Sequence, residues 1–376
     1  MIFYLKQFDK ELVKFSLEDA RLQGLNCSIL DISEKNKYLL PVGMELSDEG
    51  LLSWLKTRIV PKDRYYVDRI LASMGLSHTD TIGILKICLG LSLNDSYWVV
   101  PDGMKLKFSD YNLYDNDFSA ALSLVAYTGY GSVKARGFTS SPEFTTNGML
   151  RKGWRRINGD IVLFKGGTEG AANSGNEPYC EFYASQIAKA MNINHIEYDL
   201  AKWKHHVCST CKLFTSKDVS FVPIWRFGSF KNFTEIMTFI KSCGDNIYDE
   251  FCDMMVFDAL IYNTDRHQGN YGFLVDNKTN KILSFAPVFD NGLGLFPYAM
   301  KDDFNNIESY AATRYSAFDV PFDAVVAEII TSRQKEKLRA ILNFKFTKHK
   351  NYNFPAERLK ITESFIQKRA AELLEL

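Results

Sequence analysis

The pattern of apolar and polar positions divides the chain into a mixed start, a second mixed region and a helical end. Near the N-terminus, short runs rich in β-branched and aromatic residues predict strands at residues 3–8, 11–17, 26–32 and 37–43. Apolar residues spaced three and four apart then predict helices at residues 47–59, 62–75 and 80–90. Residues 1–130 are therefore expected to form an N-terminal α/β module, separate from the next region or part of it.

The second region follows a stretch rich in glycine, serine and threonine. Residues 160–167 read as a buried strand that ends beside Lys165, and Asn176 can cap a helix over 177–191. Two more strand candidates cover residues 194–201 and 205–216. Residues 131–215 are thus expected to form a small α/β lobe.

The remaining residues, 216–376, carry mainly the three-to-four spacing of helices. Such segments lie at residues 233–243, 247–263, 322–330, 333–342 and 355–376. Between them, residues 271–275 and 281–285 read as two short strands joined by a polar turn. The fold class indicated is α+β, with the small lobe followed by a larger, mainly helical lobe.

Composition narrows the class of protein. Lysine plus arginine and aspartate plus glutamate number 45 each, so no net charge attracts nucleic acid. A local basic stretch, Arg151, Lys152, Arg155 and Arg156 around Trp154, is interpreted as a solvated strand edge rather than a nucleic-acid site.

Neither targeting nor disulfide chemistry is indicated. The seven cysteines are odd in number and scattered, and the Cys208–Cys211 spacing has no second pair to complete a zinc site. The start of the chain lacks a leader pattern, and no run of 18 apolar residues occurs. A cytoplasmic protein without a membrane segment is expected.

The most informative residues lie around the two short strands. Asp265 and Asn270 share a loop that follows a long apolar helix, and Asp290 follows the strand pair. Transfer of a phosphoryl group from ATP requires one carboxylate to orient the acceptor hydroxyl, and a carboxylate and an amide to hold Mg²⁺ on the phosphates. Asp265 suits the first role, as catalytic base, and Asn270 and Asp290 suit the second.

Two upstream residues complete this set. A lysine at the end of a strand, here Lys165, can reach the phosphates of ATP, and an acid on the next helix can hold its ammonium. Glu181 is the preferred partner, because Glu177 lies in the first helical turn, where an acid complements the helix dipole.

These motifs resemble those of HipA-like serine/threonine kinases, and by pattern the short bacterial members of CtkA type. The order Asp-Arg-His in NTDRHQGN, reversed from that of ordinary protein kinases, carries the resemblance together with FTTNGMLRKGW, Lys165, the EFYAS helix, CKLFTS and FDNG. It covers about residues 130–300. The resemblance implies a two-lobed protein-kinase-like fold, ATP and Mg²⁺ as cofactors, and phosphorylation of protein serine or threonine.

The resemblance also implies further site residues. His267 would lie near the phosphates, and Lys212, Leu213 and Phe214 would offer backbone groups to adenine. The glycine-rich motif of ordinary kinases is missing, so the backbone of Thr145, Thr146, Asn147 and Gly148 would have to cover the phosphates. HipA-like kinases can autophosphorylate in this loop, where the candidates are Ser140, Ser141, Thr145 and Thr146.

Acceptor and partner remain open at this point. The leading interpretation is an autophosphorylating protein kinase that acts as a toxin or regulatory effector in a bacterial cytoplasm or after delivery, with an antitoxin or regulatory protein as a further partner. A lipid or small-molecule kinase of phosphatidylinositol-kinase-like type is the first alternative. The second is a non-catalytic adaptor that binds nucleotide, which the intact set of Lys165, Asp265, Asn270 and Asp290 disfavours.

Overall fold

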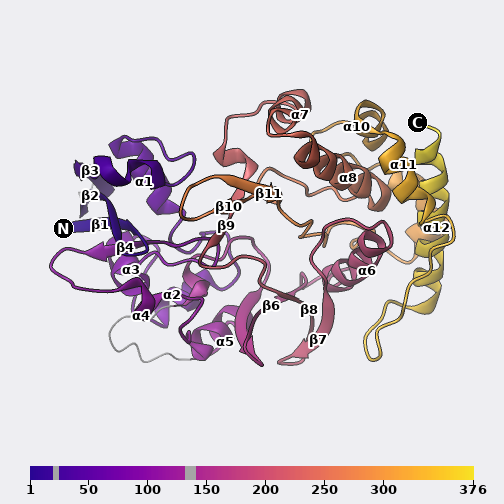
Figure 1. Ribbon diagram of the computed structural model, residues 1–376. Coiled ribbons are helices and arrows are strands. Elements are labelled where there is room, and N and C mark those ends of the chain that lie inside the picture. The colour runs from indigo at the N-terminus through magenta and orange to yellow at the C-terminus, as the bar shows by residue number, and fades with distance from the viewer. Residues whose placement is uncertain (20–24, 132–140) are drawn as a thin grey trace. The chain divides into compact units, whose positions relative to one another are not determined.

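The computed structural model describes residues 1–19, 25–131 and 141–376 (Figure 1). These residues form two compact units. Unit 1 comprises Met1–Leu163, Leu213–Val222 and Leu274–Leu283, and unit 2 comprises Phe164–Lys212, Pro223–Phe273 and Ser284–Leu376. The chain passes between the units after residues 163, 212, 222, 273 and 283, and not at residue 130. The three-part division stays a prediction.

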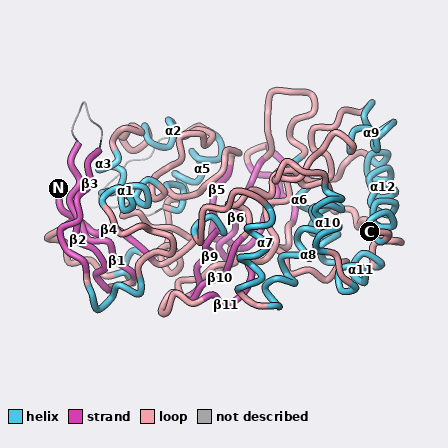
Figure 2. The backbone as a smooth tube through the Cα atoms, turned by 90° about the horizontal axis from the view of Figure 1, so that it is seen from above, coloured by secondary structure: helices cyan, strands magenta, loops and turns pink. Residues whose placement is uncertain are grey.

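Unit 1 begins with an antiparallel sheet of order β3-β2-β1-β4, whose strands β1, β2 and β3 lie side by side in Figure 2. Alternate residues of β1 point to one face, where Phe3 and Leu5 are fully buried. Its strands are β1 (Ile2–Gln7), β2 (Lys10–Asp19), β3 (Leu25–Ile32) and β4 (Tyr97–Pro101). Three of the predicted N-terminal strands are thus confirmed.

The fourth predicted N-terminal strand is wrong. Residues 37–39 belong to a short 3-10 helix, η1 (Glu34–Leu39), and residues 40–43 follow it. The helix places Leu39 in the core. Pro41 explains the difference, because proline has no N–H to donate to a neighbouring strand.

Helices α1, α3 and α5 of unit 1 begin at side-chain caps. Ser47, Asp80 and Ser119 each accept a hydrogen bond from the backbone N–H three residues later. The three predicted helices are confirmed, in shorter form. The helices are α1 (Asp48–Lys56), α2 (Val67–Ala72), α3 (Thr81–Cys88), α4 (Phe108–Tyr111) and α5 (Ala120–Thr128).

The basic stretch after residue 150 differs from the predicted solvated edge. Arg151 and Lys152 are buried, and Arg156 donates hydrogen bonds to the carbonyls of residues 113, 114 and 116. Only Arg155 is exposed. Three of the four charges therefore stabilise the fold, because buried cations require polar partners.

The middle of the chain contributes two further sheets, of order β5-β6-β8-β7 and β11-β10-β9. Strand β9 was not predicted, β5 falls on the basic stretch that was interpreted as a strand edge, and residues 194–198 precede β7 rather than forming it. The elements are β5 (Lys152–Ile157), β6 (Asp160–Gly166), α6 (Glu177–Ala190), β7 (Asp199–Trp203), β8 (His206–Lys212), β9 (Val219–Pro223), β10 (Gly272–Asp276) and β11 (Ile282–Phe285). Short 3-10 turns are η2 (Pro142–Phe144), η3 (Ile224–Arg226) and η4 (Asp302–Asn306).

Helix α8 forms the centre of unit 2. It contacts α7, α10, α11 and α12, and all its residues from Phe251 to Ile261 are buried. A helix covered on several sides is expected to be apolar nearly all round, so the buried Asp258 near its end stands out. The helices are α7 (Phe233–Ser242), α8 (Asp245–Ile261), α9 (Ile307–Ala311), α10 (Phe322–Ile329), α11 (Ser332–Arg339) and α12 (Ala356–Leu374), which confirms the predicted ones.

None of the described helices is both long enough and apolar enough to cross a membrane.

Candidate active site

Three of the predicted residues, Lys165 at the end of β6, Glu181 and Asp290, are in contact. The Nζ of Lys165 donates to Glu181 Oε1 at 2.8 Å and also to Asp290 Oδ1. Glu181 is fully buried, and its other oxygen accepts a hydrogen bond from the backbone N–H of Asn291 at 2.7 Å. Burial alone would lower the pKa of Lys165, but the carboxylates of Asp290 and Glu181 raise it above its ordinary value. The side chain is therefore held as an ammonium between two carboxylates.

The competing acid, Glu177, makes different contacts. Its Oε1 accepts hydrogen bonds from the backbone N–H of Thr168 at 3.2 Å and from the hydroxyl of Tyr298 at 3.0 Å. Asn176 starts α6 without capping it, because its side-chain amide donates to the carbonyls of residues 173 and 297. Helix α6 thus presents Glu181, the preferred candidate, to the lysine.

The loop after α8 carries Asp265 and Asn270. Helix α8 stops at Tyr262, whose φ of 53° is left-handed. Asn270 then closes the loop, since its side-chain amide donates to the carbonyl of Asp265 at 2.9 Å. Across the described residues, no side chain or backbone N–H donates to the Asp265 carboxylate or to Asn270 Oδ1. Both predicted groups keep acceptor oxygens available for a substrate or an ion.

The electrostatic surroundings of Asp265 suit a proton acceptor. Burial raises its pKa, the neighbouring charge of Asp290 raises it further, and His267, Lys165 and Arg266 partly oppose this. A base works best when its pKa approaches the working pH. The raised pKa of Asp265 is a shift in that direction.

Arg266 links the two loops, a role that the sequence did not reveal. Its side chain is almost fully buried, and Nε and Nη2 bind the two oxygens of Asp258 at 2.8 and 2.9 Å. Nη2 also donates to Asn291 Oδ1 at 2.6 Å, and Nη1 to the carbonyls of Asn270 at 3.2 Å and of Phe289. All five N–H groups of the guanidinium are used. The signal available in the sequence was Asp258, an acid inside an apolar helix that needs a buried partner.

Asp290 lies in an unusual backbone conformation. Its φ is 55°, in the left-handed region, and its N–H donates to the hydroxyl of Tyr198 at 3.1 Å. No pattern in the sequence pointed to Tyr198 as part of this site.

The residues predicted to hold Mg²⁺ fit that ion by chemistry. Asp290 supplies a carboxylate and Asn270 an amide oxygen, the oxygen ligands that Mg²⁺ accepts alongside substrate phosphates and water. Within the described part of the chain, no three His, Cys, Asp or Glu residues gather as a metal site. Two protein ligands leave coordination positions for phosphate oxygens and water, as is usual where Mg²⁺ is bound together with a nucleotide.

The predicted phosphate-covering loop lies in unit 1, where it is tightly hydrogen-bonded. Thr145 Oγ1 donates to the carbonyl of residue 91 at 2.8 Å, and Thr146 Oγ1 donates to that of residue 142 at 2.6 Å. The carbonyl of Asn147 accepts from Lys152 Nζ at 2.6 Å. Gly148 has a φ of 89°, and a Cβ there would lie 2.5 Å from the same Nζ. The loop geometry thus requires glycine at position 148.

The arginine Arg64 fixes the start of this loop. It is buried with Glu143, to whose carboxylate and carbonyl it donates, and it also donates to the carbonyl of Lys152 at 3.1 Å. Ser141, nearby, is 1% exposed. Among the autophosphorylation candidates, Ser141 and Thr145 are therefore buried, Thr146 is half-buried, and Ser140 lies outside the described residues.

The expected adenine-binding segment continues from β8. The N–H of Leu213 already donates to the carbonyl of Ile161 at 2.9 Å, and the ring of Phe214 packs against Phe221 with centroids 5.7 Å apart. The role of Lys212, Leu213 and Phe214 stays a prediction.

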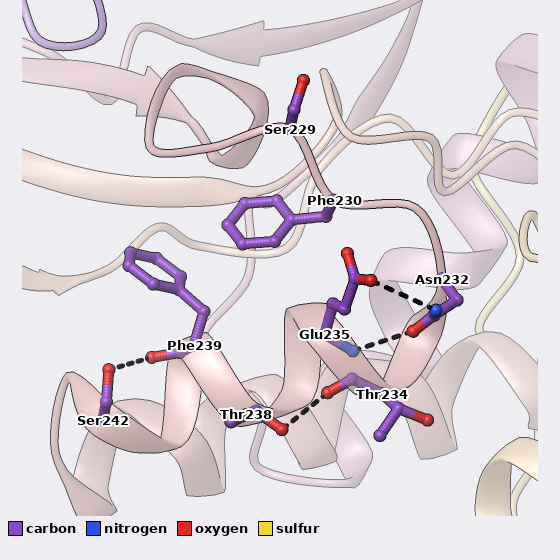
Figure 3. Close-up of a pocket in the computed structure, with 8 residues that line it drawn as sticks. All are labelled: Ser229, Phe230, Asn232, Thr234, Glu235, Thr238, Phe239 and Ser242. Carbon is purple, nitrogen blue, oxygen red and sulfur yellow. Dashed lines mark hydrogen bonds between the residues drawn. The ribbon is translucent and has the colours of Figure 1, made fainter.

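A shallow open pocket of about 650 Å³ lies along α7. Figure 3 shows the rings of Phe230 and Phe239 beside a row of hydroxyl side chains on the helix. The side-chain amide of Gln268 donates to the carbonyl of Phe230 at 3.2 Å, so the pocket adjoins the loop that carries Asp265. None of the predicted site residues lines it. The hydroxyl residues are Ser229, Thr234, Thr238 and Ser242.

Comparison with known proteins bears on the family and the fold. No family model matches the chain. Over 141 residues the chain is 30% identical to the serine/threonine-protein kinase CtkA of Helicobacter pylori, a match that covers 33% of this chain and 42% of CtkA. A crystal structure of the proinflammatory kinase CtkA of Helicobacter pylori is 18% identical, with a TM-score of 0.46, over 60% of this chain and 91% of that one.

A second solved structure covers the whole chain. It is the toxin–antitoxin complex of HipA, HipB and operator DNA from Shewanella oneidensis MR-1, in which the matching chain is 12% identical, with a TM-score of 0.54, over 100% of this chain and 99% of that one. The predicted mixed α/β, kinase-like fold is confirmed by this likeness. The sequence match is to a serine/threonine-protein kinase over a part of the chain, and the fold is shared with HipA.

Proposed function

We propose that this chain, a HipA-like kinase by its local match to CtkA and by its fold, transfers the γ-phosphoryl group of ATP to a serine or threonine of a protein. The matched stretch spans less than half of CtkA, so the activity, acceptor and partners are inferred from the site. The proposal therefore depends on what the residues of unit 2 can do.

One observation carries the proposal: the contacts of Lys165 with Glu181 and Asp290, close to an Asp265 carboxylate that has no partner among the described residues. The ammonium of Lys165 lies beside two carboxylates, of which Asp290 is of the right type for Mg²⁺, and it is within the electrostatic range of a third, Asp265.

Each residue has a role in this proposal. Lys165 would bind the phosphates, and Glu181 would orient its ammonium. Asn270 and Asp290 would hold Mg²⁺, which neutralises charge on the phosphates when bound. Asp265 would orient the acceptor hydroxyl and take its proton, a task that its raised pKa favours.

The acceptor is proposed to be a protein, and the pocket along α7 supports this choice. It adjoins the loop of Asp265, and its aromatic and hydroxyl lining offers packing and hydrogen bonds to an extended segment. Autophosphorylation in the 141–148 loop belongs to the same proposal, and at Ser141 or Thr145 it would require the buried part of the loop to open. An antitoxin or regulatory partner, by analogy with the HipA and HipB complex, is a further part of it.

The decisive experiment compares wild-type protein with Asp265→Ala and Asp290→Ala in γ-labelled ATP and Mg²⁺. Loss of the base is expected to lower phosphoryl transfer by about 10²- to 10⁴-fold, and loss of a metal ligand by a similar factor. Asp302→Ala removes an exposed acid of the same unit and should leave the rate unchanged. Wild-type rates in both site variants would refute the assignment.

The same incubation separates the alternatives for the acceptor. Phosphosites found by mass spectrometry on serine or threonine of the chain or of lysate proteins support the proposal. Label only in lipid or small molecules supports the phosphatidylinositol-kinase-like alternative. Nucleotide binding without any transfer supports the adaptor.

A further inference from the structure

We infer that Tyr198 is a positioning residue for Asp290: its hydroxyl holds the backbone of Asp290 in the left-handed conformation that turns the carboxylate toward Lys165. This inference rests on the proposed function, because Asp290 is there a ligand of Mg²⁺. All the residues that carry it lie in unit 2.

The register of two neighbouring segments brings Tyr198 to Asp290. His195 and Val288 form a parallel bridge, in which the N–H of Val288 donates to the carbonyl of residue 194 at 2.8 Å and its carbonyl accepts from the N–H of residue 196 at 2.9 Å. If this ladder continued, the N–H of Asp290 would donate to the carbonyl of residue 196. The φ of 55° ends the ladder at Asp290, and the hydroxyl of Tyr198 accepts the N–H instead.

The hydroxyl of Tyr198 is suited to this role. Burial raises its pKa well above the ordinary value for tyrosine, so it stays neutral and keeps its own proton. The thiol of Cys211 on β8 acts on the same hydroxyl. The hydroxyl can thus accept from the N–H of Asp290 while its own proton stays available to an acceptor.

The charges around Tyr198 keep its hydroxyl protonated. The carboxylates of Glu181 and Asp290 both act on the hydroxyl, and each favours its neutral form. Burial raises the pKa of the Cys211 thiol to about 12, so this partner is neutral as well.

Loss of the Tyr198 hydroxyl is expected to weaken the binding of Mg²⁺ at Asp290. A left-handed conformation is uncommon outside glycine, and the surrounding contacts have to hold it. Without the hydroxyl, the N–H of Asp290 loses its partner, and the backbone can relax toward the ladder with residue 196. The carboxylate would then leave the position from which it reaches both Lys165 and the ion.

The test is Tyr198→Phe, which removes one oxygen. Binding of the non-hydrolysable analogue AMP-PNP is measured by calorimetry over a series of Mg²⁺ concentrations, and again in EDTA. Partners that orient a metal ligand typically contribute about 10- to 100-fold to metal affinity. The Mg²⁺ concentration for half-maximal enhancement is expected to rise by about 10-fold or more, while binding in EDTA stays unchanged.

The matched control is Tyr183→Phe. It removes another buried tyrosine hydroxyl of unit 2, which donates to Asn353 Oδ1 at 2.7 Å, away from Asp290. Its Mg²⁺ response should equal that of the wild type. Cys211→Ala, which leaves Tyr198 without its second partner, is expected to shift the response in the same direction by a smaller factor, and it serves if Tyr198→Phe does not fold.

Two outcomes overturn the inference. One is a Mg²⁺ response of Tyr198→Phe equal to that of the wild type, and the other is an equal shift in Tyr183→Phe. Failure of the proposed function looks different, because wild-type protein would then show no Mg²⁺-dependent binding of the analogue.

Discussion

Arg266 offers the most direct test of how the site is built. The change is Arg266→Met, which keeps the length of the side chain and removes the charge and all five donors. The guanidinium is 1% exposed, and its bidentate partner Asp258 is 3% exposed. The substitution therefore leaves a buried carboxylate without its counter-charge.

The expected cost follows from these contacts. Removing one partner of a buried ion pair costs about 3–5 kcal/mol. The acceptors on Asn270, Phe289 and Asn291 also lose a donor, and each buried orphan costs about 1 kcal/mol or more. Because such terms do not add fully, we expect the free energy of unfolding to fall by about 5 kcal/mol. A typical domain has only about 5–15 kcal/mol.

The assay is equilibrium unfolding in urea, followed by tryptophan fluorescence. Trp203 and Trp225 both lie in unit 2 and report on this part of the chain. The double variant Arg266→Met with Asp258→Asn removes both charges and should recover about 2 kcal/mol of the loss, since the buried charge is no longer unpaired. Arg339→Met, at an exposed surface pair, is the control and should cost less than about 1 kcal/mol.

The result that would refute the reasoning is a loss below about 1 kcal/mol in Arg266→Met. That value is typical of an exposed ion pair and would mean that the guanidinium does not hold the two loops together. A double variant no more stable than the single one would instead show that the unpaired charge is not the main cost.

The other predictions concern the lysine partner, the base and the loop of unit 1. Glu181→Gln should lower kcat/KM for ATP by about 10- to 100-fold, because one charge-assisted hydrogen bond is lost. Glu177→Gln should change kcat/KM by only about a few-fold. Equal effects of the two substitutions in steady-state kinetics would contradict the choice of Glu181. The raised pKa of Asp265 predicts that kcat/KM falls as the pH decreases, because only the ionised carboxylate accepts a proton. The midpoint of this fall should lie above 3.8, the ordinary pKa of an aspartate, and a midpoint at or below that value would count against the role of Asp265. Arg64→Leu should speed hydrogen–deuterium exchange in peptides covering residues 141–148 relative to the exposed control Arg69→Leu, and unchanged exchange would show that the buried pair with Glu143 does not hold this loop.

The types of residue needed for phosphoryl transfer were readable from the sequence because they are local. Asp265 and Asn270 lie five residues apart on one loop, and the short strands β10 and β11 between this loop and Asp290 follow from alternation and turn residues. The long helices were also predictable, because burial on one or more faces imposes a period that is visible without the fold.

The errors have two causes. In residues 37–43 a proline inside a strand-like stretch prevents the strand, whereas residues 194–198 form a single bridge to Val288, a neighbour from elsewhere in the chain. Arg151 and Lys152 read as surface charges, since their buried partners cannot be seen from the local sequence.

At the site, tertiary structure decided which of two acids meets the lysine and how Asp290 is held. Lys165 and Asp290 are 125 residues apart, and Asp290 and Tyr198 are 92 apart. Periodicity reports which face of an element is buried, but contact across such separations depends on how whole elements pack and in which register. The sequence alone therefore determined the chemistry available to the site, and packing determined the partners that aim it.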